Sequence, residues 1–284
     1  MWTHHLKTID FLDYQSPHYK GPAIKMGAGV QAFEAYAAAD QRGLAVVGGI
    51  CSTVGLAGGY TQGGGHSPLS STYGMAADQV LEWEVVTGEG QLIRASRTHN
   101  SDMYWGLSGG EGGTYGVVYS LTSKVHKDIP VAGADLTISS TGISTDTFYK
   151  AIGYYHAFLP NISRAGGESL HLISQNLFAI APITFPGASG AVEVARLLKP
   201  FTEYLTQLGI QYDLNITQFP SFLSEYRAMF PPSLDKVGVA LYGGRLIPHS
   251  VIETNNDALT AVVGNIVEDG GNFVGFGLDV SMIV

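Results

Sequence analysis

Apolar side chains recur at every second residue in several short segments, which is the spacing of half-buried β-strands. Residues 80–87 alternate in this way, and the Gly-Glu-Gly turn at 88–90 predicts a hairpin that returns through residues 91–95. Further strands are expected at residues 23–30, 44–47, 114–125, 131–139, 170–182, 212–219 and 273–280.

Other segments carry apolar side chains at the three- and four-residue spacing of a helix face. We expect Gly43 to end one helix as a left-handed cap, Ser101 to cap a second, and Pro200 to interrupt a third. These helices are expected at residues 31–42, 102–107 and 188–208, with another at 146–159 and a helical turn at 73–79.

The last helix is expected to begin at a capping box formed by Ser250 and Glu253. Six apolar side chains of this helix are expected to face the core: Val251, Ala258, Leu259, Val262, Val263 and Ile266.

The order of these elements predicts an α+β protein of two domains. A chain of 284 residues fits about two domains at roughly 150 residues each. Helices alternate with longer strands after residue 126, which favours helices on one face of an antiparallel sheet. We therefore expect one domain at residues 1–126 and a second at residues 127–284.

A glycine-rich loop at residues 48–67 holds eight glycines and the only cysteine of the chain, Cys51. Glycine permits positive φ angles and lets a ligand lie against bare backbone N–H groups. A mobile linker is the alternative, but linkers are usually Ser-rich and lack interleaved Val, Leu, Ile and Tyr. The loop is therefore expected to bind a phosphate or a flat ring.

A second glycine cluster, at residues 109–113, runs directly into the strand at 114–125, so both loops could converge on one extended ligand. The pentapeptide at 106–110 also matches the G-x-S-x-G pattern, which would make Ser108 a hydrolase nucleophile. That motif needs a strand before the serine and a helix after it, whereas this sequence offers the reverse. The hydrolase is kept as a minor alternative.

Composition and charge narrow the class of ligand. Hydrophobic residues make up 45% of the chain and charged ones 14%, with no apolar run of the ~20 residues that a membrane span needs. Fifteen basic and twenty-four acidic side chains give a net charge of −9, which argues against nucleic acid. An anionic ligand would be held by backbone N–H groups. A single cysteine excludes a disulfide framework and multi-cysteine metal motifs, and no metal site is expected.

Four segments, at residues 47–59, 63–66, 73–80 and 102–118, also carry a family resemblance. Together they resemble the FAD-binding domain of berberine-bridge-enzyme-like FAD-linked oxidases, which have a PCMH-type domain and belong to the vanillyl-alcohol-oxidase (VAO) superfamily. The sequence looks most similar to secreted fungal members. The resemblance covers residues 1–126 well and continues more loosely through the second domain, where it implies a substrate-binding domain with an antiparallel sheet.

The resemblance implies FAD as cofactor. In that family the cysteine of the matching loop, here Cys51, can be bonded to flavin C6, and the position of Gly49 lies beside the ring where oxygen approaches. Besides Gly49, the implied cofactor contacts are Cys51, Ser52, Thr53, Val54, Gly55, Gly58, Gly59, Thr61, Gly63, Gly64, Gly65, His66, Gly116, Val117 and Val118.

The resemblance further implies an oxidase that passes hydride from a small organic substrate, such as an alcohol, a sugar or a secondary metabolite, to flavin, with molecular oxygen as acceptor. No nucleic-acid or membrane partner is expected. The family form is secreted, and the sequons at Asn161 and Asn215 permit glycosylation, although residues 1–7 do not read as a signal peptide. The alternative is a catalytically silent flavoprotein remnant.

The sequence departs from the family pattern at three points. Glu111 stands where the family usually has glycine, and a carboxylate would repel a pyrophosphate nearby. The family's upstream pyrophosphate loop and histidine are expected before Trp2, and its last segment, with the catalytic base, is expected after Val284. Both domains are thus expected to be incomplete here, and this chain alone is expected to bind FAD poorly.

Overall fold

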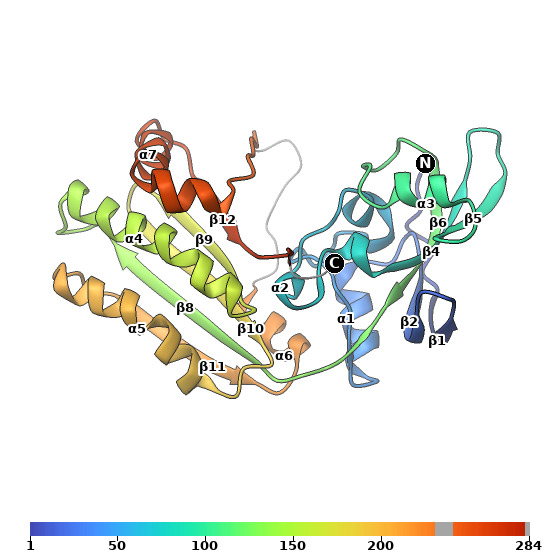
Figure 1. Ribbon diagram of the computed structural model, residues 1–284, viewed down its shortest axis with the longest axis horizontal. Helices are drawn as coiled ribbons and strands as arrows, with labels where there is room; N and C mark the ends of the chain where they lie inside the picture. The colour runs from blue at the N-terminus through green and yellow to red at the C-terminus, as the bar shows by residue number, and fades with distance from the viewer. Residues whose placement is uncertain (231–240, 282–284) are drawn as a thin grey trace. The chain divides into compact units, whose positions relative to one another are not determined.

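Figure 1 shows the computed structural model of the chain, which describes residues 1–230 and 241–281. The chain divides into two compact units, each with its own five-stranded sheet. The first unit takes in Met1–Ile129, Ser221–Tyr226 and the short stretch from Val280, and the second takes in Pro130–Pro220 and Arg227–Asp279.

The sheet of the first unit has the order β1-β2-β6-β4-β5, and every neighbouring pair is antiparallel. The predicted hairpin at residues 80–95 is confirmed as the pair β4 and β5. The strands are β1 (Ile9–Gln15), β2 (Lys20–Gly27), β4 (Val80–Val86), β5 (Leu92–Ser96) and β6 (Val117–Lys124), and a separate two-stranded pair is formed by β3 (Leu44–Ala45) and β7 (His126–Lys127).

A largely buried carboxylate ties three strands of this sheet together. Glu84 of β4 contacts Lys25 of β2 at 2.8 Å and accepts a hydrogen bond from Ser120 of β6 at 2.5 Å. Burial opposes ionisation of Glu84, but the hydrogen bonds from Lys25 and Ser120 outweigh it and lower the pKa of the carboxyl group. The carboxylate therefore stays charged inside a sheet whose core includes Trp83 and Leu121.

The helices of the first unit are short, and they border the glycine-rich loop. They are α1 (Ala32–Asp40), the π-helical turn η1 (Leu56–Tyr60), α2 (Ser70–Tyr73), the 3₁₀ turn η2 (Ala76–Gln79) and α3 (Ser101–Leu107). Gly43 takes a left-handed φ of +64° after α1, as predicted. The expected Ser101 cap is wrong, because Asn100 precedes α3 and its side chain donates to the Arg94 carbonyl instead.

The sheet of the second unit has the order β11-β8-β10-β9-β12, again with antiparallel neighbours only. Its strands are β8 (Val131–Ser139), β9 (Glu168–Ser174), β10 (Leu177–Pro186), β11 (Asp213–Phe219) and β12 (Phe273–Gly277). Residues 170–182, predicted as one strand, in fact form the β9–β10 hairpin. The polar pair Gln175-Asn176 makes the turn without a glycine or proline to mark it.

Three helices, α4 (Thr145–Arg164), α5 (Ala191–Gln207) and α7 (His249–Glu268), lie together on one face of this sheet (Figure 1). Tyr155, Phe178 and Phe201 are fully buried where helices and strands meet. This arrangement confirms the predicted α+β fold with helices on one face of an antiparallel sheet. No helix among the described residues is long and apolar enough to cross a membrane.

Two helix predictions in this unit are wrong. α5 continues through Pro200, because the apolar stripe of Leu198, Phe201 and Leu205 keeps its register on both sides of the proline. α7 begins at His249 after Pro248, so Ser250 and Glu253 form no capping box.

The buried stripe of α7 is also displaced from the predicted one. It comprises Ile252, Val263, Gly264 and Val267, whereas Val251, Val262 and Ile266 are exposed. Asn255 has a non-helical φ of −141°, and this kink shifts the phase of the helix.

Candidate functional site

The glycine-rich loop leaves β3 and passes α1 before it closes into the π-helical turn η1. All five backbone carbonyls of residues 49–53 accept hydrogen bonds. In chain order the donors are the Tyr36 phenol at 2.7 Å, the Tyr226 phenol at 2.7 Å, Val54 N–H at 3.2 Å, Phe33 N–H at 3.0 Å and the Gln31 side-chain amide at 2.6 Å.

The N–H groups of the same five residues donate no hydrogen bond within the described part of the chain. Gly49 is buried, residues 50–52 are half-buried and Thr53 is exposed. Buried backbone groups are usually paired, so the unpaired N–H of Gly49 is the feature that most needs a partner. The scaffold thus holds the loop by its carbonyls and leaves a row of donors for water or an acceptor ligand. Successive backbone N–H groups of this kind form anion-binding concavities.

The two glycine-rich loops, which the sequence suggested could converge on one ligand, contact each other. The Gln62 carbonyl accepts hydrogen bonds from the N–H groups of Gly109 and Glu111, both at 3.0 Å. A Cβ atom on Gly112 would lie 2.7 Å from the Cα atom of Gly59, so the two backbones meet without room for a side chain. One extended ligand can therefore touch both loops.

The glycines of the loops serve two different purposes. Gly48 and Gly65 are required by packing, because a Cβ atom would lie 2.6 Å from the Tyr36 hydroxyl oxygen and 2.8 Å from the Tyr60 ring, respectively. In contrast, a Cβ atom on Gly58 or Gly59 would have no neighbour within 4 Å. Protein packing does not explain those two glycines, and contact with a ligand would.

Cys51 is a half-buried free thiol beside the row of unpaired amides. The phenol of Tyr226 lies close by: burial, and then the negative charge that Cys51 carries when ionised, raise the pKa of Tyr226 to about 12. Tyr226 is 6% exposed and stays protonated, so its hydroxyl remains a donor to the Ile50 carbonyl at 2.7 Å.

The residues present fit an anionic, flat cofactor such as FAD. The loop at residues 48–66 contains no lysine or arginine, so it offers neutral donors, chief among them its unpaired N–H groups, to the oxygens of such a cofactor. Gln62 is 3% exposed, and its side-chain oxygen has no hydrogen-bond partner among the described residues. The described residues contain no cluster of three or more His, Cys, Asp or Glu side chains that could hold a metal ion.

The other predicted contacts occupy varied positions. The side chain of Thr61 is buried and its hydroxyl donates to the Leu56 carbonyl at 2.5 Å, so it shapes η1. The His66 carbonyl accepts from the Tyr60 phenol at 2.7 Å. Gly116 and residues 117–118 lie at the start of the central strand β6, where a Cβ atom on Gly116 would lie 2.7 Å from a methyl group of Val85.

The backbone conformation decides how the predictions for Ser108 and Glu111 stand. Ser108 ends α3 and is followed by a loop, and its hydroxyl donates to the Tyr104 carbonyl at 2.8 Å. It therefore lacks the strand-to-helix turn of a hydrolase nucleophile. Glu111 has a left-handed φ of +73°, a conformation that glycine adopts without strain, which accounts for the expectation of glycine at this position.

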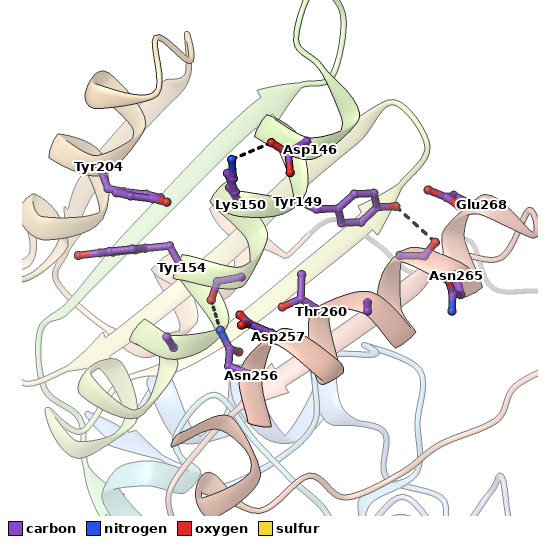
Figure 2. A pocket seen from close by; sticks show the side chains of 14 residues that line it. Asp146, Tyr149, Lys150, Tyr154, Tyr204, Asn256, Asp257, Thr260, Asn265 and Glu268 are labelled. Atoms are coloured by element: carbon purple, nitrogen blue, oxygen red, sulfur yellow. Dashed lines mark hydrogen bonds and ion pairs between the residues drawn. The ribbon is translucent and has the colours of Figure 1, made fainter. Parts of the chain in front are cut away.

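The second unit offers a groove of about 570 Å³ between α4, α5 and α7 (Figure 2). The rings of Tyr154 and Tyr204 stack at 4.1 Å along one side of it. The Asn256 side chain donates to the Gly153 carbonyl at 2.7 Å, across the seam between α7 and α4. The lining side chains include neither a thiol nor an imidazole, and their contacts chiefly tie α4 to α7.

Comparisons with known proteins agree with this site. A family model described as an FAD binding domain matches residues 9–96. The chain is 50% identical to the FAD-linked oxidoreductase patO of Aspergillus clavatus, over 100% of this chain and 50% of that protein. It is 44% identical to the FAD-linked oxidoreductase sthB of Phaeosphaeria nodorum, over 80% of this chain and 72% of that protein. The crystal structure of the VAO-type flavoprotein MtVAO615 from Myceliophthora thermophila C1 superimposes with a TM-score of 0.89 at 39% identity, covering 98% of this chain and 52% of the other.

The fold and the glycine-rich loop define a flavoprotein of the VAO type, with FAD as the cofactor. The chain belongs to the family of FAD-linked oxidoreductases. It spans about half the length of the first curated relatives that it matches. The expectations of a VAO-type fold and of FAD as cofactor are thereby confirmed, whereas the individual cofactor contacts stay predictions.

Sequence reasoning missed the aromatic side chains that support the loop. Tyr36 lies at an ordinary core position of the helix expected at residues 31–42, and Tyr226 lies 176 residues from the carbonyl that it binds. The glycine at position 48 was the available signal, because glycine often marks a close approach of another group to the backbone. That signal shows the contact but not the partner.

Proposed function

We propose that the protein to which this chain belongs is an FAD-dependent oxidase, and that the first unit supplies the loops that hold the cofactor. The observation that carries the proposal is the row of unpaired N–H groups at residues 49–53, whose carbonyls are all paired with the scaffold. The relatives named as FAD-linked oxidoreductases and as a VAO-type flavoprotein oxidase support it.

When bound, FAD would supply the redox chemistry, that is, a hydride acceptor for the substrate and a two-electron donor for oxygen. The residues of this chain bind and orient it. The amides of residues 50–53 donate no hydrogen bond within the described chain, and we expect them to bind its oxygens, while Gly58 and Gly59 leave open space against the backbone. Cys51 is the only thiol that could attach to the cofactor.

We propose a small organic substrate, such as an alcohol, a sugar or a secondary metabolite, with molecular oxygen as acceptor. For an alcohol, two hydrogens leave the substrate carbon and its hydroxyl, and oxygen becomes hydrogen peroxide. The closer likeness to secreted berberine-bridge-enzyme-like members belongs to this proposal, and so does secretion of the whole protein.

The test is the flavin content of the purified whole protein to which this chain belongs. We expect an absorption band at about 450 nm, the mark of a flavin cofactor, and equal yields of hydrogen peroxide and oxidised product from a panel of primary alcohols and sugars. Protein that stays colourless after incubation with FAD, and releases no peroxide with any of them, would refute the proposal.

A further inference from the structure

Two buried tyrosine phenols bind consecutive backbone carbonyls just before Cys51. The hydroxyl of Tyr36, from α1, donates to the Gly49 carbonyl, and the hydroxyl of Tyr226 donates to the Ile50 carbonyl, both at 2.7 Å. Tyr226 comes from α6 (Phe222–Met229), far along the chain, yet it belongs to the first unit. The two side chains are 2% and 6% exposed.

The two phenols come from a single aromatic cluster. The rings of Tyr36 and Tyr226 meet edge to face with centroids 4.9 Å apart, and Phe222 packs against Tyr36 at 5.3 Å. Both carbonyls therefore point towards the same side of the loop.

Because the peptide bond is planar, the direction of each carbonyl fixes the direction of the N–H group in the same peptide. The loop peptides are trans, since the only cis bond in the described chain joins Ala181 and Pro182. In a trans peptide the N–H of each residue points opposite to the preceding carbonyl. The N–H of Ile50 therefore points away from Tyr36, and the N–H of Cys51 points away from Tyr226.

We propose that Tyr36 and Tyr226 are positioning residues that orient the amides of Ile50 and Cys51 towards the flavin cofactor. This inference rests on the proposed function, because it assigns the pair a role in the same site. Gly48 is part of the same arrangement of phenols and loop carbonyls, since a Cβ atom there would lie 2.6 Å from the Tyr36 hydroxyl oxygen and displace it. Each phenol stabilises one peptide orientation, and together they keep two successive donors on the cofactor side.

The variants Tyr36→Phe and Tyr226→Phe remove only the hydroxyl groups. Tyr104→Phe is a matched control, because Tyr104 is a buried tyrosine of the same unit whose phenol donates to the Val80 carbonyl at 2.7 Å, away from the loop. Gly48→Ala is a second route to the same effect, since it displaces the Tyr36 hydroxyl without removing it.

The first readout needs no flavin. Cys51 is the only thiol, so its rate of labelling by a neutral maleimide reports the freedom of the loop. We expect labelling to rise about fivefold in Tyr226→Phe, the equivalent of one neutral hydrogen bond, with a similar rise in Tyr36→Phe and Gly48→Ala. Tyr104→Phe should label at the unmodified rate once all four variants show the same circular dichroism.

The second readout is the dissociation constant of FAD, measured by quenching of flavin fluorescence. Tyr36→Phe and Tyr226→Phe should each weaken binding about fivefold, again one hydrogen bond, and Tyr104→Phe should not. Labelling and binding that match those of Tyr104→Phe would overturn the inference. If the unmodified whole protein to which this chain belongs binds no FAD, the proposed function fails, and the labelling rates alone then decide whether the two phenols hold the loop.

Discussion

At the residue scale, Cys51 gives the most direct test of the chemistry of the glycine-rich loop. It is half-buried, and it is the only cysteine of the chain. A thiolate is the nucleophile that attack on a flavin ring requires. We expect flavin-loaded protein to retain its yellow colour after acid precipitation, and Cys51→Ala to lose it. An unchanged attachment mass in Cys51→Ala would show that the bond is made elsewhere or not at all.

Gly49 is the second residue with a testable role, the approach of oxygen to the flavin. Its φ is not positive, so alanine can adopt the same backbone, although the added Cβ would lie 3.0 Å from the Tyr60 ring. Interiors are packed tightly enough that one methyl group is felt. In flavin-loaded Gly49→Ala we expect reoxidation by oxygen to slow at least tenfold, about 1.4 kcal/mol on the barrier, with flavin reduction unchanged.

The control for Gly49→Ala is Gly88→Ala, in a turn where a Cβ atom has no neighbour within 4 Å. Stopped-flow absorbance measures the two half-reactions separately. Equal reoxidation rates in Gly49→Ala and the unmodified protein would dispose of the oxygen role, and so would loss of flavin binding.

The residue scale also shows which parts of the site could be predicted from the sequence. Glycine spacing identifies the loop, because eight glycines within twenty residues leave much of the backbone open to contact. The tyrosines that hold the loop are not identifiable in this way. Tyr36 looks like any core position of a helix, and the pairing of Tyr226 with Ile50 is a long-range contact that only the folded chain creates.

At the scale of elements, hydrophobic periodicity predicts helices and strands reliably where one face of the element is buried and where glycine or proline marks its ends. Residues 131–139 were predicted as a strand and form β8 with those bounds. The β9–β10 hairpin was missed because Gln175-Asn176 carries no glycine or proline, and the edge strand β1 was missed because most of its side chains are at least partly exposed. Local propensity cannot separate these cases, since sheet pairing decides them.

The contact between the two glycine-rich loops gives a prediction at this scale. A Cβ atom on Gly112 would lie 2.7 Å from the Gly59 Cα atom, and backbone on both sides limits relaxation. We expect Gly112→Ala to cost about 1–3 kcal/mol, as overpacking does, and to weaken the hydrogen bonds of Gln62 with Gly109 and Glu111. Thermal unfolding and amide hydrogen exchange at residues 109–111 measure the two effects. Gly88→Ala should change stability by less than about 0.5 kcal/mol, as surface substitutions usually do, and an equal change in both variants would contradict the packing argument.

At the scale of the whole molecule, two buried histidines and one half-buried histidine make stability depend on pH. Burial lowers the pKa of His156 to about 4, while burial and then the charge of His156 lower that of His171 to about 3. The two rings lie 5.6 Å apart in the second unit. In the first unit, burial and then the charge of Lys124 lower the pKa of His126 to about 4.

The sign of the pH effect follows from these pKa values. A histidine in the unfolded chain titrates near 6.5, whereas the folded forms stay neutral down to about 4. Between these values the unfolded state binds more protons, so stability is greatest above pH 6.5 and falls as the pH drops. Carboxyl groups with a lowered pKa, such as those of Glu34 and Glu84, also stabilise the fold when ionised, and this stabilisation is lost only at lower pH.

We therefore expect the thermal midpoint to become lower as the pH is reduced from 7 to 5. The free energy of unfolding should decrease by at most about 1.4 kcal/mol per pH unit for each of these histidines. His171→Phe keeps a ring in the same core and removes one titrating group, so its slope between pH 6 and pH 5 should be shallower by that amount. His18 is exposed, so His18→Gln provides the control for replacing a histidine outside the core. Calorimetric unfolding at half-unit pH steps measures all three proteins. A slope in His171→Phe equal to that of the unmodified protein would show that His171 does not contribute to the pH dependence, which would contradict its assignment as a buried neutral histidine.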